Sequence, residues 1–244
     1  MRLTRVHVPG PLACGNRHTI EGDAANHIAR VLRLERGAAL TLFDGRGGEH
    51  AARIEEFRKG AVIVAVGERS AADQESRLPL TLAQGVSRGE RMDWVVQKAT
   101  ELGVTRIVPV LTERTLVKLD PRQSERKLQH WQGIAIAACE QSGRTRIPDI
   151  APPLALHEFL RQSSEARAVR ILLSPTGTQR LGDLLTPDGG LIVLIGPEGG
   201  LAESEQRAAL DAGFLAMRLG PRVLRTETAA VAALTLLQHR FGDL

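Results

Sequence analysis

The spacing of apolar residues divides the chain into two parts with different rhythms. Before residue 70, short runs with β-type alternation occur at RLTRVHV, AALTLFDG, EHAARIEEF and AVIVAVGER, separated by turn residues such as DGRGG and RKG. One helical pattern, GDAANHIARVLRL, interrupts these runs, and Ile28, Val31, Leu32 and Leu34 form its apolar stripe. The pattern predicts a small, strand-rich N-terminal part with one helix.

Beyond a polar stretch that ends in proline, SAADQESRLP, the pattern changes to strands that alternate with helices. Apolar runs at PLTLAQGV, RIVPVL, VRILLSP, LIVLIGPEGG and FLAMRLG predict strands. Helical patterns fall at RGERMDWVVQKATELG, at about 122–141, at 204–212 and in the alanine-rich C-terminal stretch. Strands that alternate with helices favour an α/β fold with a largely parallel sheet covered on both faces.

Composition excludes several classes of function. No apolar run is long enough to span a bilayer, and MRLTRVHVPG lacks the apolar segment of a signal peptide, so we expect a cytoplasmic protein with no membrane contact. Cys14 and Cys139 have no CxxC partner, and neither HExxH nor a Cys/His ligand cluster occurs, so no metal site is expected. The net charge of +4 permits RNA binding, but with 3% aromatic residues we expect arginines rather than stacked rings to hold the RNA.

Three predicted strands end in turns that contain glycine or proline. LIVLIG continues into PEGG, FLAMRLG into PRVLRTE, and RILL into SPTG. Glycine allows a sharp turn and lets a ligand touch the main chain, and ligands of open α/β sheets bind beyond the carboxyl ends of strands. A shared pocket is therefore favoured over three turns without a ligand, although the sequence leaves open whether these strands are neighbours. Because G-x-G-x-x-G and P-loop motifs do not occur, a dinucleotide is not predicted.

The charged residues at the start of the last helix have two interpretations. In the first, Thr226 caps the helix, Glu227 favours its positive end, and an arginine pairs with the glutamate. In the second, Arg222 or Arg225 lies near a buried pocket and stabilises negative charge that develops on a substrate. Both interpretations can hold at once.

Other basic residues gather on predicted helix faces and helix ends. His27, Arg30 and Arg33 follow one another at i, i+3, i+6 spacing, and Lys98 and Arg144 lie near helix ends. A solvated helix face is the simpler interpretation, and a row of contacts to RNA phosphates is the alternative.

Taken together, these motifs resemble those of one family. LIGPEGG followed by LGPRVLRTETA resembles the signature of the bacterial 16S rRNA uridine-N3 methyltransferases (RsmE type, SPOUT class). HIARVLRL, FDGRGGEH, SRGERMDWVVQKATELGV, LTERTLVK and ACEQSGRTRIP follow in the family's order, so the resemblance spans nearly the whole chain. Two positions depart from the family pattern: Ala202 replaces a frequent Ser or Thr helix cap, and His130 replaces a more usual arginine.

The resemblance implies a fold of two domains. Residues 1–72 would form a PUA-like, RNA-binding β-barrel. Residues 73–244 would form a SPOUT-type α/β domain with a trefoil knot, a rare exception to unknotted topology. The resemblance also implies a homodimer whose pocket lies close to the subunit interface.

The resemblance further implies methylation, dependent on S-adenosylmethionine, of uracil N3 of a uridine in the decoding region of 16S rRNA in the small ribosomal subunit. The implied cofactor-binding residues are Leu173, Ser174, Ile195, Gly196, Pro197, Glu198, Gly199, Gly200, Leu219, Gly220, Arg222, Val223, Leu224, Arg225 and Thr226. Candidate catalytic residues are Arg222 and Arg225, which would stabilise the uracil anion, and Glu198 and Glu227, which would accept the proton. Candidate RNA-binding residues are His27, Arg30, Arg33, Arg88, Lys98 and Arg144.

The sequence is compatible with three alternatives. A SPOUT enzyme could methylate another RNA base or a ribose 2′-OH, because its cofactor pocket would be the same. A non-catalytic ribosome-assembly factor could keep the fold, but Gly196, Gly199, Gly200, Gly220 and Arg225 are all intact. A nucleotide-dependent oxidoreductase could use a doubly wound sheet, but the G-x-G-x-x-G turn is missing.

Overall fold

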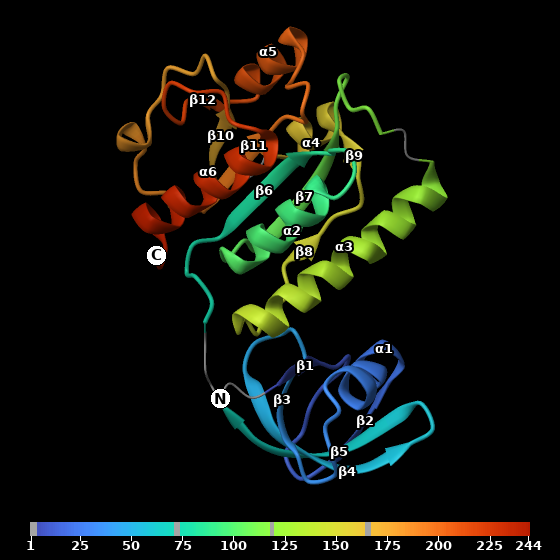
Figure 1. Cartoon of the computed structure of the whole chain (residues 1–244). Coiled ribbons are helices and arrows are strands. Elements are labelled where there is room, and N and C mark those ends of the chain that lie inside the picture. The colour runs from blue at the N-terminus through green and yellow to red at the C-terminus, as the bar shows by residue number, and fades with distance from the viewer. Residues whose placement is uncertain (1–3, 71–73, 118–119, 164–166) are drawn as a thin grey trace. The chain divides into compact units, whose positions relative to one another are not determined.

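A computed structural model describes residues 4–70, 74–117, 120–163 and 167–244. The chain divides into two compact units, whose elements are labelled in Figure 1. Unit 1 comprises Met1–Glu75 and Cys139–Ile147, and unit 2 comprises Ser76–Ala138 and Pro148–Leu244.

Unit 1 is built on a five-stranded sheet with the order β1-β3-β4-β5-β2. Its strands are β1 (Arg5–His7), β2 (Arg17–Glu21), β3 (Ala39–Phe43), β4 (Glu49–Arg58) and β5 (Ala61–Ser70). The β1–β3 pair is parallel and the other pairs are antiparallel. The β4–β5 pair has two shifts of register, and such irregularities increase the local twist. The sheet curls into a half-barrel, with β1 and β2 as the outer strands (Figure 1).

The helix of unit 1 is shorter and less regular than the sequence pattern predicts. α1 (Gly22–Asn26) continues directly into η1 (His27–Val31), a π-helical turn with i→i+5 winding. Ile28 is fully buried in the core of this unit, whereas Val31 is 67% exposed. The expected apolar stripe is therefore wrong at Val31, because π-helical winding rotates successive side chains away from an α-helical face.

Unit 2 contains a parallel sheet with the order β12-β10-β11-β6-β7-β8, and β9 also pairs with β7. This arrangement confirms the predicted largely parallel sheet. The strands are β6 (Leu80–Gly85), β7 (Arg106–Leu111), β8 (Asp149–Ile150), β9 (Leu154–Ala155), β10 (Val169–Leu173), β11 (Leu191–Ile195) and β12 (Leu215–Met217). All five residues of β11 are buried, as expected for a central parallel strand.

Helices pack around this sheet and complete unit 2 (Figure 1). They are α2 (Arg91–Glu101), α3 (Pro121–Ser142), α4 (Leu156–Ser163), the 3₁₀ turn η2 (Leu181–Asp183), α5 (Glu203–Asp211) and α6 (Thr226–Phe241). α3 continues from unit 2 into unit 1 at Cys139. Phe159 of α4 and Phe214 after α5 pack against Ile192 and Leu194 of β11 in one apolar cluster. α6 contacts α2, and Gln238 fastens it by donating to the carbonyl oxygen of Leu102 at 2.8 Å. No helix among the described residues is both long and apolar enough to cross a bilayer.

Candidate active site

The carboxyl ends of three adjacent strands meet at one edge of the sheet in unit 2. β10 lies between β11 and β12, so that Ile171 is opposite Val193 on one side and Leu215 on the other. All three strands run parallel, and their carboxyl ends therefore point the same way. The three strand-end turns noted in the sequence are thus neighbours.

These turns enclose a cavity of about 730 Å³, within the range of small-molecule and cofactor pockets. Of the predicted cofactor-binding residues, Gly220 is the one that does not line the cavity; the lining includes Leu173, Ser174, Ile195, Gly196, Pro197, Glu198, Gly199, Gly200, Leu219, Arg222, Val223, Leu224, Arg225 and Thr226. Glu227 lines it as well. The residues predicted from the motifs therefore lie around one cavity, and their roles in binding and catalysis stay predictions.

The sequence motifs missed other parts of the lining. These residues are Arg91, Arg114, Leu172, Pro175, Thr176, Leu201, Gln206, Met217, Arg218 and Ala229. Arg91 belongs to the RGERM stretch at the start of α2, and Arg114 belongs to the LTERT stretch after β7. Both stretches match the family's order of motifs, but nothing in their local pattern places them beside the turn after β11.

The turn after β11 packs closely against the end of β6. A Cβ atom at Gly85 would lie 2.3 Å from the backbone nitrogen of Pro197, far inside contact distance. A Cβ atom at Gly196 would lie 3.0 Å from backbone atoms of Gly200 and Leu201. A side chain at Gly85 would therefore force the main chains apart, and one at Gly196 would fit only if the turn moved by a few tenths of an ångström.

Thr226 fastens the same turn to the start of α6. Its hydroxyl donates to the carbonyl oxygen of Gly196 at 2.7 Å and accepts from Nε2 of Gln84 at 2.8 Å. Arg225 is the N-cap residue, with extended backbone angles and no side-chain capping bond. The prediction that Thr226 caps the helix is therefore wrong, because its buried hydroxyl bonds to the neighbouring turn instead.

Glu198 is held by donors from the start of α2. Its Oε1 accepts from the backbone N–H of Arg88 at 2.9 Å and from the guanidinium of Arg91 at 2.7 Å. Burial raises the pKa of Glu198, but hydrogen bonds from its own backbone, from Arg88 and from Arg91 outweigh this effect, so the pKa is lowered overall. A carboxylate with a lowered pKa is a weaker proton acceptor, and this environment suits a role in holding the turn.

Glu227 differs from Glu198 in having an unused acceptor. Its Oε2 is buried without a hydrogen-bond partner among the described residues. The ion pair with Arg222 or Arg225 that the sequence suggested does not form in the described structure, so that interpretation is wrong. Buried polar atoms normally have partners, and Glu227 therefore offers an acceptor to a ligand in the cavity.

Five arginines and two glutamates line the cavity, which gives the lining an excess of positive charge. The arginines are Arg91, Arg114, Arg218, Arg222 and Arg225. All five are exposed residues. Arg114 donates to the carbonyl oxygen of Gly199 at 3.0 Å and thereby supports the turn after β11 from a second side.

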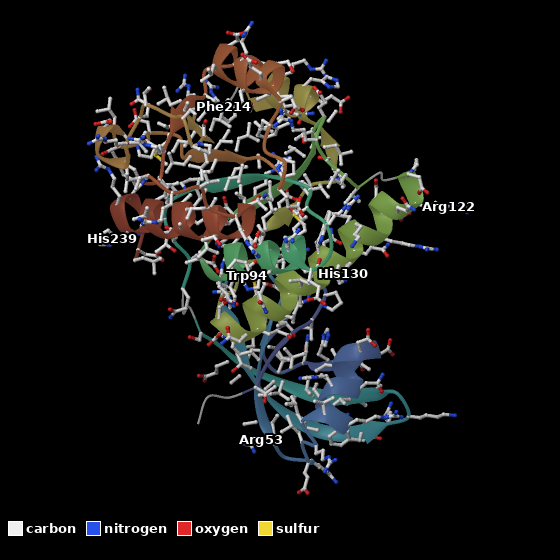
Figure 2. The ribbon with its side chains drawn as sticks, turned by 45° about the horizontal axis from the view of Figure 1, so that its top comes forward. Arg53, Trp94, Arg122, His130, Phe214 and His239 are labelled. Carbon is white, nitrogen blue, oxygen red and sulfur yellow. The ribbon has the colours of Figure 1, made fainter. Side chains whose placement is uncertain are left out.

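The two departures from the family pattern have local structural consequences. Ala202 is the N-cap of α5 and makes no side-chain cap, but Oε2 of Glu205 still accepts from its backbone N–H at 2.9 Å. Half of the capping box is thus retained. Nε2 of His130 lies 2.7 Å from Oδ2 of Asp93, while Nε1 of Trp131 donates to Oδ1 of the same carboxylate at 3.1 Å. Figure 2 shows His130 on α3.

The predicted RNA-binding residues have different environments. His27, Arg30, Arg33 and Arg88 are exposed. Lys98 is partly buried and paired with Glu101 at 2.8 Å.

Arg144 belongs to the interior of unit 1. Its side chain is 4% exposed, and its guanidinium donates to Glu75 at 2.7 and 3.0 Å. The other oxygen of Glu75 accepts from the backbone N–H groups of Thr145 and Arg146. The interpretation of a solvated helix face is therefore wrong for Arg144.

The described residues contain no group of three or more His, Cys, Asp or Glu side chains placed to hold a metal ion.

Comparison with family models shows the class of protein to which the chain belongs. Residues 74–238 match the family model of an RNA methyltransferase domain, and residues 20–66 match that of an RNA methyltransferase PUA domain. The protein is thus an RNA methyltransferase with a PUA domain.

Individual relatives show to which family within this class the chain belongs. Ribosomal RNA small subunit methyltransferase E of Buchnera aphidicola is 31% identical, and the alignment covers 100% of this chain and 98% of the relative. The same-named protein of Bacillus subtilis is 28% identical, with 91% and 90% covered. A crystal structure of the enzyme of that name from Neisseria gonorrhoeae, bound to S-adenosyl methionine, is 37% identical and superposes with a TM-score of 0.93 over 100% of both chains. A protein of Legionella pneumophila, solved with bound SAM, is 40% identical with a TM-score of 0.96, again over 100% of both chains. The chain belongs to the ribosomal RNA small subunit methyltransferase E family, which confirms the resemblance seen in its motifs.

Proposed function

We propose that this protein transfers a methyl group from S-adenosylmethionine to N3 of a uridine in the decoding region of 16S rRNA. The observation that carries the proposal is the single cavity enclosed by the turns after β10, β11 and β12 and lined by arginines. The substrate would be the small ribosomal subunit or its 16S rRNA, and the place of action the cytoplasm.

The residues of the cavity fit S-adenosylmethionine. Buried apolar side chains of Leu172, Ile195 and Met217 suit the faces of an adenosyl group. The main chain at Gly196 lies open to the cavity, where no Cβ atom keeps a ligand away from it. We propose that the predicted cofactor-binding residues hold this molecule, with Gly220, at a φ of 75°, shaping the third turn.

The chain's own residues would position the base and manage one proton. S-adenosylmethionine supplies, when bound, an electrophilic methyl group whose leaving thioether is neutral, so positioning carries most of the acceleration. Uracil N3 carries a proton and becomes a good nucleophile once that proton leaves. Arg222 and Arg225 would stabilise the resulting negative charge on O2 and O4. Glu227, with its free acceptor, is better suited than Glu198 to take the proton.

The wider organisation is proposed on the same basis. Residues 1–72 would be the RNA-binding domain, and residues 73–244 the catalytic domain, with a trefoil knot and a homodimer interface near the cavity. The exposed His27, Arg30, Arg33 and Arg88, together with Lys98, would contact RNA phosphates. We leave Arg144 out of this set because its guanidinium is buried against Glu75.

The decisive experiment measures transfer of labelled methyl groups to unmodified small subunits and to naked 16S rRNA. Mass spectrometry of the digested nucleosides should detect 3-methyluridine, and the comparison of the two substrates tells whether the folded particle is read. A methylated ribose or another methylated base would replace the N3 assignment. Binding of S-adenosylmethionine without transfer to either substrate would favour a different RNA or base as the target. Failure to bind S-adenosylmethionine would favour a non-catalytic assembly factor.

Replacement of the two arginines tests their role. At a saturating concentration of S-adenosylmethionine, the double variant Arg222→Ala/Arg225→Ala should lower kcat about 10²–10³-fold, as for loss of an anion-stabilising donor. Arg207→Ala, an exposed arginine of α5 outside the cavity lining, is the matched control. Unchanged turnover in the double variant would refute the assignment.

A further inference from the structure

Three exposed arginines of unit 1, Arg46, Arg69 and Arg146, gather around the loop between β3 and β4. They come from separate segments of the chain: Arg46 from the loop itself, Arg69 from β5, and Arg146 from the stretch after α3. We call these three residues the arginine cluster. None of them belongs to the set predicted from the sequence to bind RNA.

Two members of the arginine cluster are like charges placed directly opposite each other. Arg46 and Arg146 form an isolated antiparallel β-bridge. Side chains of directly opposed bridge residues point to the same side, with Cβ atoms about 4.5–5.5 Å apart, and like charges in this arrangement repel each other. The fold therefore places the side chains of two arginines side by side on the same side of the loop.

No carboxylate offsets this repulsion among the described residues. Neither Arg46 nor Arg146 has a carboxylate oxygen within ion-pair distance of its guanidinium in the described structure. Asp44 accepts from the backbone N–H of Arg46 at 2.9 Å, and Glu75 accepts from the backbone N–H of Arg146 while its other oxygen holds Arg144. The nearby acids thus organise the backbone and leave both guanidinium charges uncompensated.

Two glycines in the loop allow the guanidinium groups of Arg146 and Arg69 to lie close to its main chain. A Cβ atom at Gly47 would lie 3.0 Å from a terminal nitrogen of Arg146, and a Cβ atom at Gly48 would lie 2.5 Å from one of Arg69. Both glycines have left-handed φ angles, 109° and 81°, which favour glycine in any case. Arg69 also donates to the carbonyl oxygen of Gly47 at 2.9 Å. Two guanidinium groups therefore lie over adjacent glycines, beside Arg46.

We propose that the arginine cluster binds phosphates of the substrate RNA. Arginine is always charged, and its planar fork matches phosphate oxygens in bidentate geometry. A phosphate beside Arg46 and Arg146 would convert their mutual repulsion into attraction, and an RNA backbone presents successive phosphates to the third arginine. The inference rests on the proposed function and names the place where substrate RNA meets unit 1.

Charge reversal at Arg46 separates an RNA-binding role from a structural one. Arg46→Glu places opposite charges across the β-bridge, so the thermal stability should stay the same or rise. Binding of naked 16S rRNA should weaken, and the slope of log K against log salt should become shallower by about 0.7–0.9 for each phosphate that the variant no longer neutralises. The variants Arg69→Ala and Arg146→Ala should also make the slope of log K against log salt shallower. If Arg46→Glu lowered Tm and RNA affinity together, the cluster would be structural and the inference overturned.

A control variant corrects for the change in net charge. Arg53, labelled in Figure 2, is an exposed residue of β4 in the same unit and donates to the carbonyl oxygen of Gly37. Arg53→Glu changes the total charge by the same amount as Arg46→Glu, and it should leave the salt slope unchanged. An equal loss of slope in both variants would show that general charge, not the arginine cluster, sets RNA affinity.

The proposed function and this inference fail in different ways. If the unaltered protein binds neither 16S rRNA nor S-adenosylmethionine, the proposed function fails. If it binds both, and Arg46→Glu retains the full salt slope, the arginine cluster is excluded while the proposed function stands. S-adenosylmethionine affinity should be the same in all variants, because every residue lining the cavity belongs to unit 2.

Discussion

A single hydroxyl group, that of Thr226, joins three segments of unit 2. It bonds to the turn after β11 through Gly196 and to the end of β6 through Gln84, while its own backbone begins α6. A threonine before an apolar helical run predicts a cap, because caps are the usual use of a hydroxyl at that place. Sequence could not reveal the partners actually used, which lie 30 and 142 positions away.

Removal of this hydroxyl should destabilise unit 2 and weaken cofactor binding. Thr226→Val keeps the side-chain volume but leaves the part-buried Gly196 carbonyl and the buried Gln84 amide without this partner, which costs about 1–3 kcal/mol for an unsatisfied buried group. Urea denaturation and titration with S-adenosylmethionine measure the two effects. Thr226→Ser should restore both, and Thr235→Val, at an exposed position of α6, should change neither. If Thr226→Val matched Thr226→Ser, the hydroxyl would have no such role.

Glu140 is a partly buried acid whose charge opposes folding. Burial raises the pKa of Glu140, and the hydrogen bond from the backbone N–H of His7 offsets only part of that effect. A raised folded-state pKa means that stability is lost as pH rises from the unfolded-state value of 4.5 through the folded-state value. Glu140→Gln keeps an acceptor for His7 and removes the charge, so its stability relative to the unaltered protein should increase as pH rises.

Urea denaturation at pH values from 4.5 upwards measures whether the stability of Glu140→Gln relative to the unaltered protein increases with pH. Glu56 provides the opposite case, because its hydrogen bond from Arg58 lowers the pKa of Glu56 on an exposed surface. The stability of Glu56→Gln relative to the unaltered protein should therefore decrease, if it changes, as pH rises. A difference for Glu140→Gln that is flat with pH would contradict the burial argument.

At the scale of elements, regular patterns were predictable and short or irregular pieces were not. The strands β6, β7, β10 and β11 follow long apolar runs, and their positions were predicted. β2 was missed because its sequence, RHTIE, contains a single apolar residue, so the alternating exposure of the strand leaves no alternation of apolar and polar residues in the sequence. α4 was missed because eight residues with a strong apolar face are too short to stand out from the loop around them. The candidate site was predicted from its turns, but the order of β10, β11 and β12 depends on long-range pairing that local pattern does not encode.

Replacement of a glycine by alanine should have opposite effects inside a helix and at a close contact between two elements. Gly133 lies exposed within α3, and beyond its chain neighbours and the helix's own backbone no atom lies within 4 Å of the position that a Cβ would take. Gly133→Ala should therefore stabilise the protein by about 0.4–1 kcal/mol. Gly85→Ala should destabilise it and weaken binding of S-adenosylmethionine, because its Cβ would collide with Pro197. Denaturation curves and ligand titration compare the pair. Equal stability of the two variants would mean that the turn after β11 can move away from β6 without loss.

At the scale of the whole molecule, the two units are not simple consecutive halves of the sequence. Cys139–Ile147 groups with unit 1 although residues on both sides of it belong to unit 2. The buried bonds of Arg144 and Thr145 to Glu75 account for this grouping. A linker recognised by composition marks where the chain leaves unit 1, but no local pattern indicates that a later segment returns to it.

This division predicts how ligand binding distributes stability. All residues that line the cavity belong to unit 2, and a ligand at 100 times its Kd stabilises the state it binds by about 2.7 kcal/mol. Hydrogen exchange should therefore slow in β10, β11 and α6 when S-adenosylmethionine is added, while β3, β4 and β5 of unit 1 keep their rates. NADH at the same concentration should change neither set of peptides, since the chain lacks a dinucleotide turn. Equal slowing in both units would mean that they open together in one cooperative step, and that stabilisation at the cavity is shared by unit 1.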